Sequence, residues 1–166
     1  MILEIREDQN VLPHFKNILD IHRTNEVIRS IDDCSPMFAG GYPMSLLFAP
    51  RCKGSLLNIK KGFYSDYDVY FPSIELFEKA SRNLQSKYND GQNAQWSIER
   101  IHVTDNAQTF IFHQEDPITG YKLQLQLVKK ITNPPAKILD TFDFINCAIG
   151  FVPNTESFFL HRDIFK

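Results

Sequence analysis

Asp66 and Asp68 are separated by one residue inside an aromatic and β-branched run, residues 63–71, and this spacing could support metal chemistry. Such a run is typical of a β-strand, in which side chains at i and i+2 share a face. Neighbouring carboxylates repel each other and are costly to desolvate, and a divalent cation relieves both effects. Carboxylate oxygens hold Mg²⁺ (or Mn²⁺) on nucleotide phosphates. The sequence therefore predicts a metal and nucleotide site on this strand, with a solvated strand face as the alternative.

Gly40 and Gly41 could bring the backbone close to phosphate oxygens, because glycine has no side chain to prevent the approach. Pro43 suits the first turn of a helix, whose free N–H groups would bind an anion. The alternative is an ordinary pair of turn glycines. Residues 51–62 contain no acidic residue and four basic ones, Arg51, Lys53, Lys60 and Lys61. This segment is either a mobile arm that neutralises a triphosphate or a solvated loop.

The combination of these motifs resembles the nucleotidyltransferase superfamily of DNA polymerase β-like enzymes. The family pattern is a hydrophobic residue, Gly, then Gly or Ser, and later Asp-hydrophobic-Asp-hydrophobic; here it reads Ala39-Gly40-Gly41 and Asp66-Tyr67-Asp68-Val69. Residues 143–148, Asp-Phe-Ile-Asn-Cys-Ala, also look like the Asp-Phe-Thr-Ile-Asn-Ala stretch of tRNA nucleotidyltransferases and bacterial poly(A) polymerases. The chain as a whole is similar to small phage-encoded nucleotidyltransferase domains, and the resemblance covers roughly residues 38–152.

The resemblance implies an α/β (α+β) fold: a mixed, mainly antiparallel sheet with helices packed on one face, in a single domain over residues 1–166. It implies transfer of a nucleoside monophosphate from an NTP to an acceptor hydroxyl, with release of pyrophosphate. The acceptor stays open between a small molecule, a protein and an RNA 3′ end. Mg²⁺ (or Mn²⁺) would be held by Asp66, Asp68 and a third carboxylate, and the phosphates by Gly40, Gly41, Lys60 and Lys61.

The third carboxylate departs from the family pattern. The regular strand expected over 122–128 alternates Leu with Gln, so its polar face carries Gln124 and Gln126. Asp143 is the favoured candidate because it precedes an apolar segment, 144–152, expected to be a strand, whereas Asp140 lies within an expected helix. If neither reaches the metals, the site would bind without turnover. A degenerate nucleotide- or RNA-binding module, or an antitoxin-like interaction protein, is therefore the alternative function.

The remaining sequence supplies the elements that must position these groups. Apolar spacing predicts a helix over 11–31 and another after Ser73, a natural N-cap, whose buried stripe would be Phe77, Ala80, Leu84 and Tyr88. Strands with a turn at 105–106 follow, and Pro134 and Pro135 suit the start of a short helix ending near Phe142.

Composition narrows the class of protein. With 166 residues, 43% of them hydrophobic, and a formal net charge of −2, the chain suits a globular domain without global attraction to nucleic acid. No run is long enough to span a bilayer, and the N-terminus lacks the apolar core of a signal peptide. Three widely spaced cysteines suit reduced thiols, so we expect a cytoplasmic protein with no membrane partner. The five histidines show no metal-ligand spacing and are interpreted as structural or surface residues.

Overall fold

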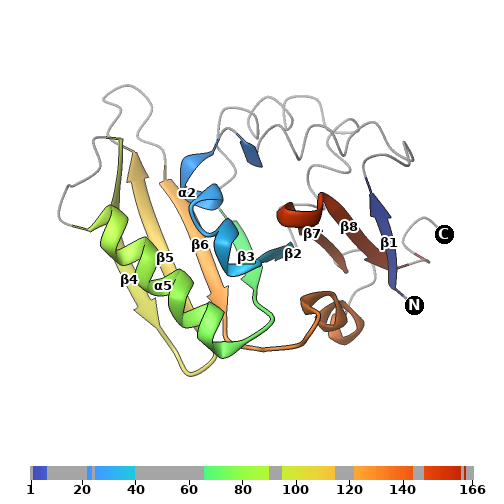
Figure 1. Cartoon of the computed structure of the whole chain (residues 1–166). Helices are drawn as coiled ribbons and strands as arrows, with labels where there is room; N and C mark the ends of the chain where they lie inside the picture. Colours follow the sequence, from blue (N-terminus) through green and yellow to red (C-terminus); the bar gives the residue numbers. More distant parts are fainter. Residues whose placement is uncertain are drawn as a thin grey trace.

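In the computed structural model, an eight-stranded sheet forms the centre of the described part of the chain, residues 2–6, 22–23, 25–39, 66–89, 95–114, 122–143, 148–161 and 163 (Figure 1). The strand order is β1-β8-β7-β2-β3-β6-β5-β4. The strands are β1 (Ile2–Arg6), β2 (Met37–Ala39), β3 (Asp66–Tyr70), β4 (Trp96–Val103), β5 (Ala107–Gln114), β6 (Lys122–Val128), β7 (Ile149–Val152) and β8 (Ser157–His161). The helices are α2 (Glu26–Arg29) and α5 (Ile74–Tyr88), with 3₁₀ turns η2 (Asp32–Cys34), η4 (Pro135–Thr141) and η6 (Pro153–Thr155).

The sheet is mixed and mainly antiparallel, which confirms the predicted fold class. Only the β3–β6 pair is parallel among the strand pairs of the described residues. Because β3 and β6 run the same way and β2 runs against both β3 and β7, one end of the sheet collects the end of β2 and the starts of β3, β6 and β7. We call this the Asp66 end of the sheet.

Helix α5 forms where the sequence predicts it and covers one face of the sheet. The Ser73 hydroxyl accepts a hydrogen bond from the Leu76 backbone N–H at 3.2 Å, which satisfies one of the free donors at the helix start. Phe77, Ala80, Leu84 and Tyr88 are all buried, as the spacing predicts. Helix α5 contacts β4 and β6, in front of which it lies in Figure 1.

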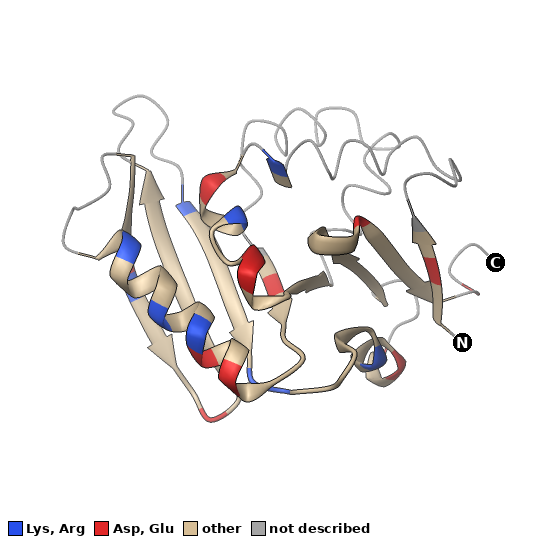
Figure 2. Cartoon of the chain, in the orientation of Figure 1, with Lys and Arg blue, Asp and Glu red and all other residues tan. Residues whose placement is uncertain are grey.

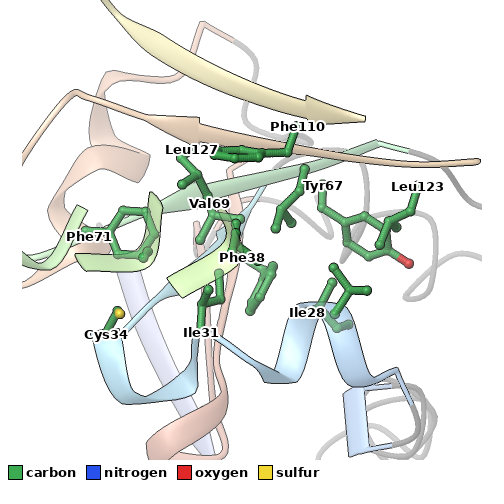
Figure 3. Close-up of a cluster of buried hydrophobic side chains, with 14 of the residues drawn as sticks. Ile28, Ile31, Cys34, Phe38, Tyr67, Val69, Phe71, Phe110, Leu123 and Leu127 are labelled. Carbon is green, nitrogen blue, oxygen red and sulfur yellow. The ribbon is translucent and has the colours of Figure 1, made fainter. Parts of the chain in front are cut away.

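The main core lies between this face of the sheet and helices α2 and α5. Tyr67 and Val69 of β3 contribute to it, together with Phe38 of β2 (Figure 3). Burial of each large apolar side chain contributes about 1.5–3 kcal/mol. Every second residue of β6 points into the same core, namely Leu123, Leu125 and Leu127. The residues between them therefore lie on the opposite face, and this confirms the alternation predicted for 122–128.

A second, smaller core lies on that opposite face, beneath η4. Met37 and Ala39 of β2 pack there with Leu139 of η4, and Tyr70 and Phe142 border them. Met37 packs closely against Gly150 of β7, and this contact requires glycine because a Cβ atom at position 150 would lie 2.6 Å from the Met37 sulfur. The predicted helices therefore cover one face, while a 3₁₀ turn covers part of the other.

Two predicted helices differ from the structure. The helix expected over 11–31 is interrupted, because Asn25 is the N-cap of α2 and its side chain accepts hydrogen bonds from the backbone N–H groups of Val27 and Ile28. Residues 11–21 lie outside the described residues. The helix expected before Phe142 is the 3₁₀ turn η4, capped by Pro134 rather than by a polar side chain. No helix among the described residues is long and apolar enough to cross a membrane.

Candidate functional site

Strand β3 carries the Asp-Tyr-Asp motif, which confirms the predicted strand, and the sheet order places β3 near the centre of the sheet. Tyr67 and Val69 are buried in the main core, with exposed fractions of 1% and 0%, so Asp68 between them belongs to the opposite face. Asp68 is half-buried there. The neighbouring strand β2 places Ala39 directly opposite Asp68. Gly40 follows Ala39 in the chain, and it lies outside the described residues.

Strand β6 flanks the motif on its other side with amides rather than acids. Its register pairs Asp66 with Gln124 and Asp68 with Gln126. In Figure 2 strand β6 shows no acidic residue along its length, in agreement with its sequence. We call the surface that bears Asp68, Gln124 and Gln126 the Gln face. A glutamine can hydrogen-bond a substrate, but it does not supply the negative charge of a third carboxylate.

The candidate third carboxylates lie near η4. Asp143 and Asp140 are both exposed, and Asp140 lies within η4. The ring of Phe142, next to Asp143, lies 6.1 Å from the ring of Tyr70, two residues beyond Asp68. This aromatic contact brings the end of η4 to the side of β3 that bears Asp68. The strand expected over 144–152 begins at Ile149 as β7, and residues 144–147 lie outside the described residues.

The pKa of Tyr70 is sensitive to burial and charge on this side of the sheet. Burial raises the pKa of Tyr70 to about 12, and the negative charge of Asp68 is the second cause. The phenol therefore stays protonated at neutral pH and can donate a hydrogen bond. Sequence reasoning did not single out Tyr70, although its position at i+2 from Asp68 on an alternating strand is a signal that could have found it.

The residues predicted to contact phosphate lie outside the described residues: Gly40, Gly41, Lys60 and Lys61. The side chain of Asp66 does too, although its backbone belongs to β3. Within the described part of the chain, no group of three or more His, Cys, Asp or Glu side chains could hold a metal ion. The donors at this site are carboxylate and amide oxygens, and this chemistry fits Mg²⁺ rather than a softer metal.

A hollow of about 380 Å³ opens on the Gln face where β4, β5 and β6 lie side by side. Among the described residues, its lining consists of polar side chains, namely Ser97, Glu99, His113 and Lys122. The Lys122 ammonium donates to the Glu99 carboxylate at 3.2 Å. The sequence analysis interpreted His113 as a structural or surface residue and did not predict this hollow, because the lining residues come from three different strands.

Comparison with known proteins identifies the family. The model of the Gabija anti-defense 2 family, Gad2, matches residues 7–166, which is nearly the whole chain. The chain belongs to the Gad2 family. Comparisons of the Gad2 chain with curated proteins and with solved structures gave no significant match.

This finding corrects the resemblance drawn from the sequence. The matching family is Gad2 and not a nucleotidyltransferase family. The expected likeness to tRNA nucleotidyltransferases, poly(A) polymerases and small phage-encoded nucleotidyltransferase domains has no support from a curated relative. The resemblance was wrong because it depended on short patterns, Gly-Gly, Asp-x-Asp and one six-residue stretch. Patterns of this length recur in unrelated proteins, whereas the Gad2 match extends over residues 7–166.

Proposed function

We propose that this Gad2 protein binds an NTP with a divalent cation at the Asp66 end of the sheet and transfers its nucleoside monophosphate to an acceptor hydroxyl, releasing pyrophosphate. The observation that carries the proposal is the pairing of Asp68 with Ala39, the residue that precedes Gly40 and Gly41 in the sequence. In this proposal the carboxylates of β3 would bind the metal, and the glycines that follow β2 in the sequence would bind the phosphates.

Each group has a separate role in this proposal. Asp66, Asp68 and Asp143 would hold Mg²⁺ (or Mn²⁺) through carboxylate oxygens. When bound, the metal would neutralise the triphosphate and lower the pKa of the attacking hydroxyl. Tyr70, kept protonated, would donate a hydrogen bond near Asp68. The basic residues Lys60 and Lys61 would contact phosphate oxygens, and most of the rate enhancement would come from positioning and charge neutralisation.

The family description supports a biological setting for this chemistry. Gad2 is described as a Gabija anti-defense family. We propose that the acceptor, or the nucleotide consumed, is a molecule on which that defence depends. A cytoplasmic location belongs to the same proposal, because free NTPs are found there and the spacing of the three cysteines suits reduced thiols.

A second candidate function is nucleotide or RNA binding without turnover, in a module that acts by occupying its partner. The specific observation in its favour is the pair of amides, Gln124 and Gln126, which flank the acidic motif in register where a further carboxylate would complete a metal site. In this case affinity for metal and nucleotide would persist, and no pyrophosphate would be released.

Thermal unfolding with each NTP and Mg²⁺ or Mn²⁺ tests both candidates. Saturation at a hundred times Kd stabilises a protein by about 2.7 kcal/mol, and for a chain of this size that raises Tm by roughly 5–10 °C. The double variant Asp66→Asn/Asp68→Asn should lose the shift. The matched control Glu75→Gln/Glu78→Gln, which removes two exposed charges from α5, should keep it.

Release of pyrophosphate from the NTP that gives the shift then separates the two candidates. Release that is lost in Asp66→Asn/Asp68→Asn supports transfer. A shift without pyrophosphate release, in the presence of candidate acceptors, supports the binding module. If no NTP shifts Tm with either metal, both candidates are wrong, and the acidic motif is a solvated strand face.

A further inference from the structure

We propose that the hollow lined by Ser97, Glu99, His113 and Lys122 binds the acceptor, through the vicinal hydroxyls of a ribose. The inference rests on the proposed function, because it assigns the acceptor of the same transfer. The shared chemistry is the ribose diol, which a free nucleoside and an RNA 3′ end both present.

The four residues converge because three adjacent strands share a register row. Ser97 of β4 pairs with His113 of β5, and His113 pairs with Lys122 of β6. Residues in one row of a sheet point to the same face, and Lys122 alternates with the buried Leu123. The hollow therefore lies on the Gln face, the face that also bears Asp68.

Glu99 reaches the hollow through an irregularity in β4. The register shifts between Ile98 and Arg100, so Glu99 is an extra residue without an opposite partner in β5. A β-bulge of this kind redirects a side chain and is common beside binding sites. In this protein it adds a carboxylate to a wall that otherwise carries the hydroxyl of Ser97 and the nitrogens of His113 and Lys122.

The wall chemistry matches a vicinal diol. Each hydroxyl of a diol donates one hydrogen bond and accepts others, so a carboxylate beside an ammonium group, as in Glu99 and Lys122, satisfies both functions. The Glu99–Lys122 pair is exposed, with side-chain exposures of 44% and 60%, and such pairs add little to stability. A ligand can therefore insert between them. The volume of about 380 Å³ is at the size of small-molecule sites.

Lys122, which lines the hollow, belongs to the strand that pairs with the acidic motif. Lys122 precedes Gln124 by two residues, and Gln124 is the partner of Asp66. With about 3.3 Å per residue along a strand and 4.8 Å between strands, the Cα atoms of Lys122 and Asp66 are about 8 Å apart. A ribose held in the hollow would therefore present a hydroxyl towards the metal site, and the α-phosphate would lie between them.

Binding of ribose-bearing probes, measured by calorimetry without metal or NTP, tests the proposal. The probes are adenosine, dideoxyadenosine, a short oligoribonucleotide, and the same oligoribonucleotide ending in a dideoxynucleotide. We expect the diol-bearing members to bind at least about tenfold more tightly than their dideoxy counterparts, the ratio expected for loss of a hydrogen bond to a charged group. Binding of adenosine assigns a free nucleoside, and binding of the oligoribonucleotide alone assigns an RNA 3′ end.

Two variants connect the binding to the hollow. Glu99→Gln should weaken diol binding about tenfold, because it removes the negative charge from the group that accepts hydrogen bonds from the diol. The matched control Glu78→Gln removes an exposed carboxylate from α5, on the other side of the sheet, and should bind like the wild type. Both variants are checked by urea unfolding, since Glu99 is exposed and its replacement should keep the fold.

Three results would overturn the proposal: no binding of either diol-bearing probe, equal binding of diol and dideoxy probes, or equal weakening by Glu99→Gln and Glu78→Gln. Because metal and NTP are absent, diol binding can succeed where pyrophosphate release fails, and the reverse is also possible. The outcome of this test is therefore distinguishable from that of the proposed transfer.

Discussion

The charge of Asp68 should be measurable at Tyr70, two residues along the same strand. The pKa of Tyr70 is raised from 10.0 to about 12, with burial as the larger cause and Asp68 as the smaller. Asp68 therefore accounts for less than half of a rise of about 2, which is less than about 1.4 kcal/mol of interaction. Asp68→Asn removes the charge and keeps the shape of the side chain, so it should lower the pKa of Tyr70 from about 12 by less than half of the rise.

Stability at high pH gives an independent measure of the same group. Between pH 10 and about 12 the folded protein keeps the Tyr70 proton that the unfolded chain releases, so this contribution to stability is complete below pH 10 and is lost as pH rises through 12. The loss attributable to Tyr70 is at most about 3 kcal/mol. Tyr70→Phe should reduce the alkaline loss of stability without abolishing it, since burial also raises the pKa of Tyr88 to about 12.

NMR titration of protein labelled in its tyrosine rings would follow these changes, with the Tyr70 resonance assigned by its absence in Tyr70→Phe. Glu78→Gln serves as the control for loss of one exposed carboxylate on α5. If the pKa of Tyr70 is unchanged in Asp68→Asn, or falls as much in Glu78→Gln, then Asp68 does not share a face with Tyr70. The assignment of the acidic motif to the Gln face would then be wrong.

Three further predictions concern the framework that positions the site. Gly150→Ala should destabilise the protein by about 1–3 kcal/mol in urea unfolding, because the added Cβ would lie 2.6 Å from the Met37 sulfur. In the double variant Gly150→Ala/Met37→Ala the clash is removed, so a loss of stability equal to the sum of the two single losses would contradict the prediction. Ser73→Ala should cost about 1 kcal/mol through loss of the α5 cap, and Ser73→Asp should retain most of the stability; equal stability of Ser73→Ala and wild type would count against the cap. Burial, followed by the charge of Asp33, raises the pKa of Cys34 to about 12. In a variant that lacks the other two cysteines, Cys52→Ser/Cys147→Ser, the Cys34 thiol should therefore react with maleimide only when the protein unfolds. Rapid reaction of the folded protein would show that Cys34 is accessible.

The incorrect family resemblance shows which properties short motifs can predict and which they cannot. The Asp-x-Asp spacing correctly predicted a strand whose intervening residue, Tyr67, is buried, because strand alternation is a local property of the backbone. The same motif did not identify the family, since only a match over residues 7–166 does so. An inference about chemistry from residue types is therefore independent of an inference about family membership from a short pattern.

The sequence by itself determined the elements whose signal is periodic. Helix α5, with its Ser73 cap and buried stripe, and strand β6, with Leu and Gln on alternate faces, were predictable because side-chain direction repeats every 3.6 or 2 residues along the chain. The conversion of the expected helix before Phe142 into the 3₁₀ turn η4 was less predictable, since its packing against β7 and β8 competes with local propensity.

Only the tertiary structure decided which strands became neighbours. The pairing of Ala39 with Asp68, and of Asp66 with Gln124, depends on β3 lying between β2 and β6, and no local pattern encodes this order. The bulge at Glu99 and the row from Ser97 to Lys122 likewise exist only once three strands have aligned. Strand order is set by the burial of both cores together, a property of the whole chain, whereas strand formation is set by residues within a few positions of each other.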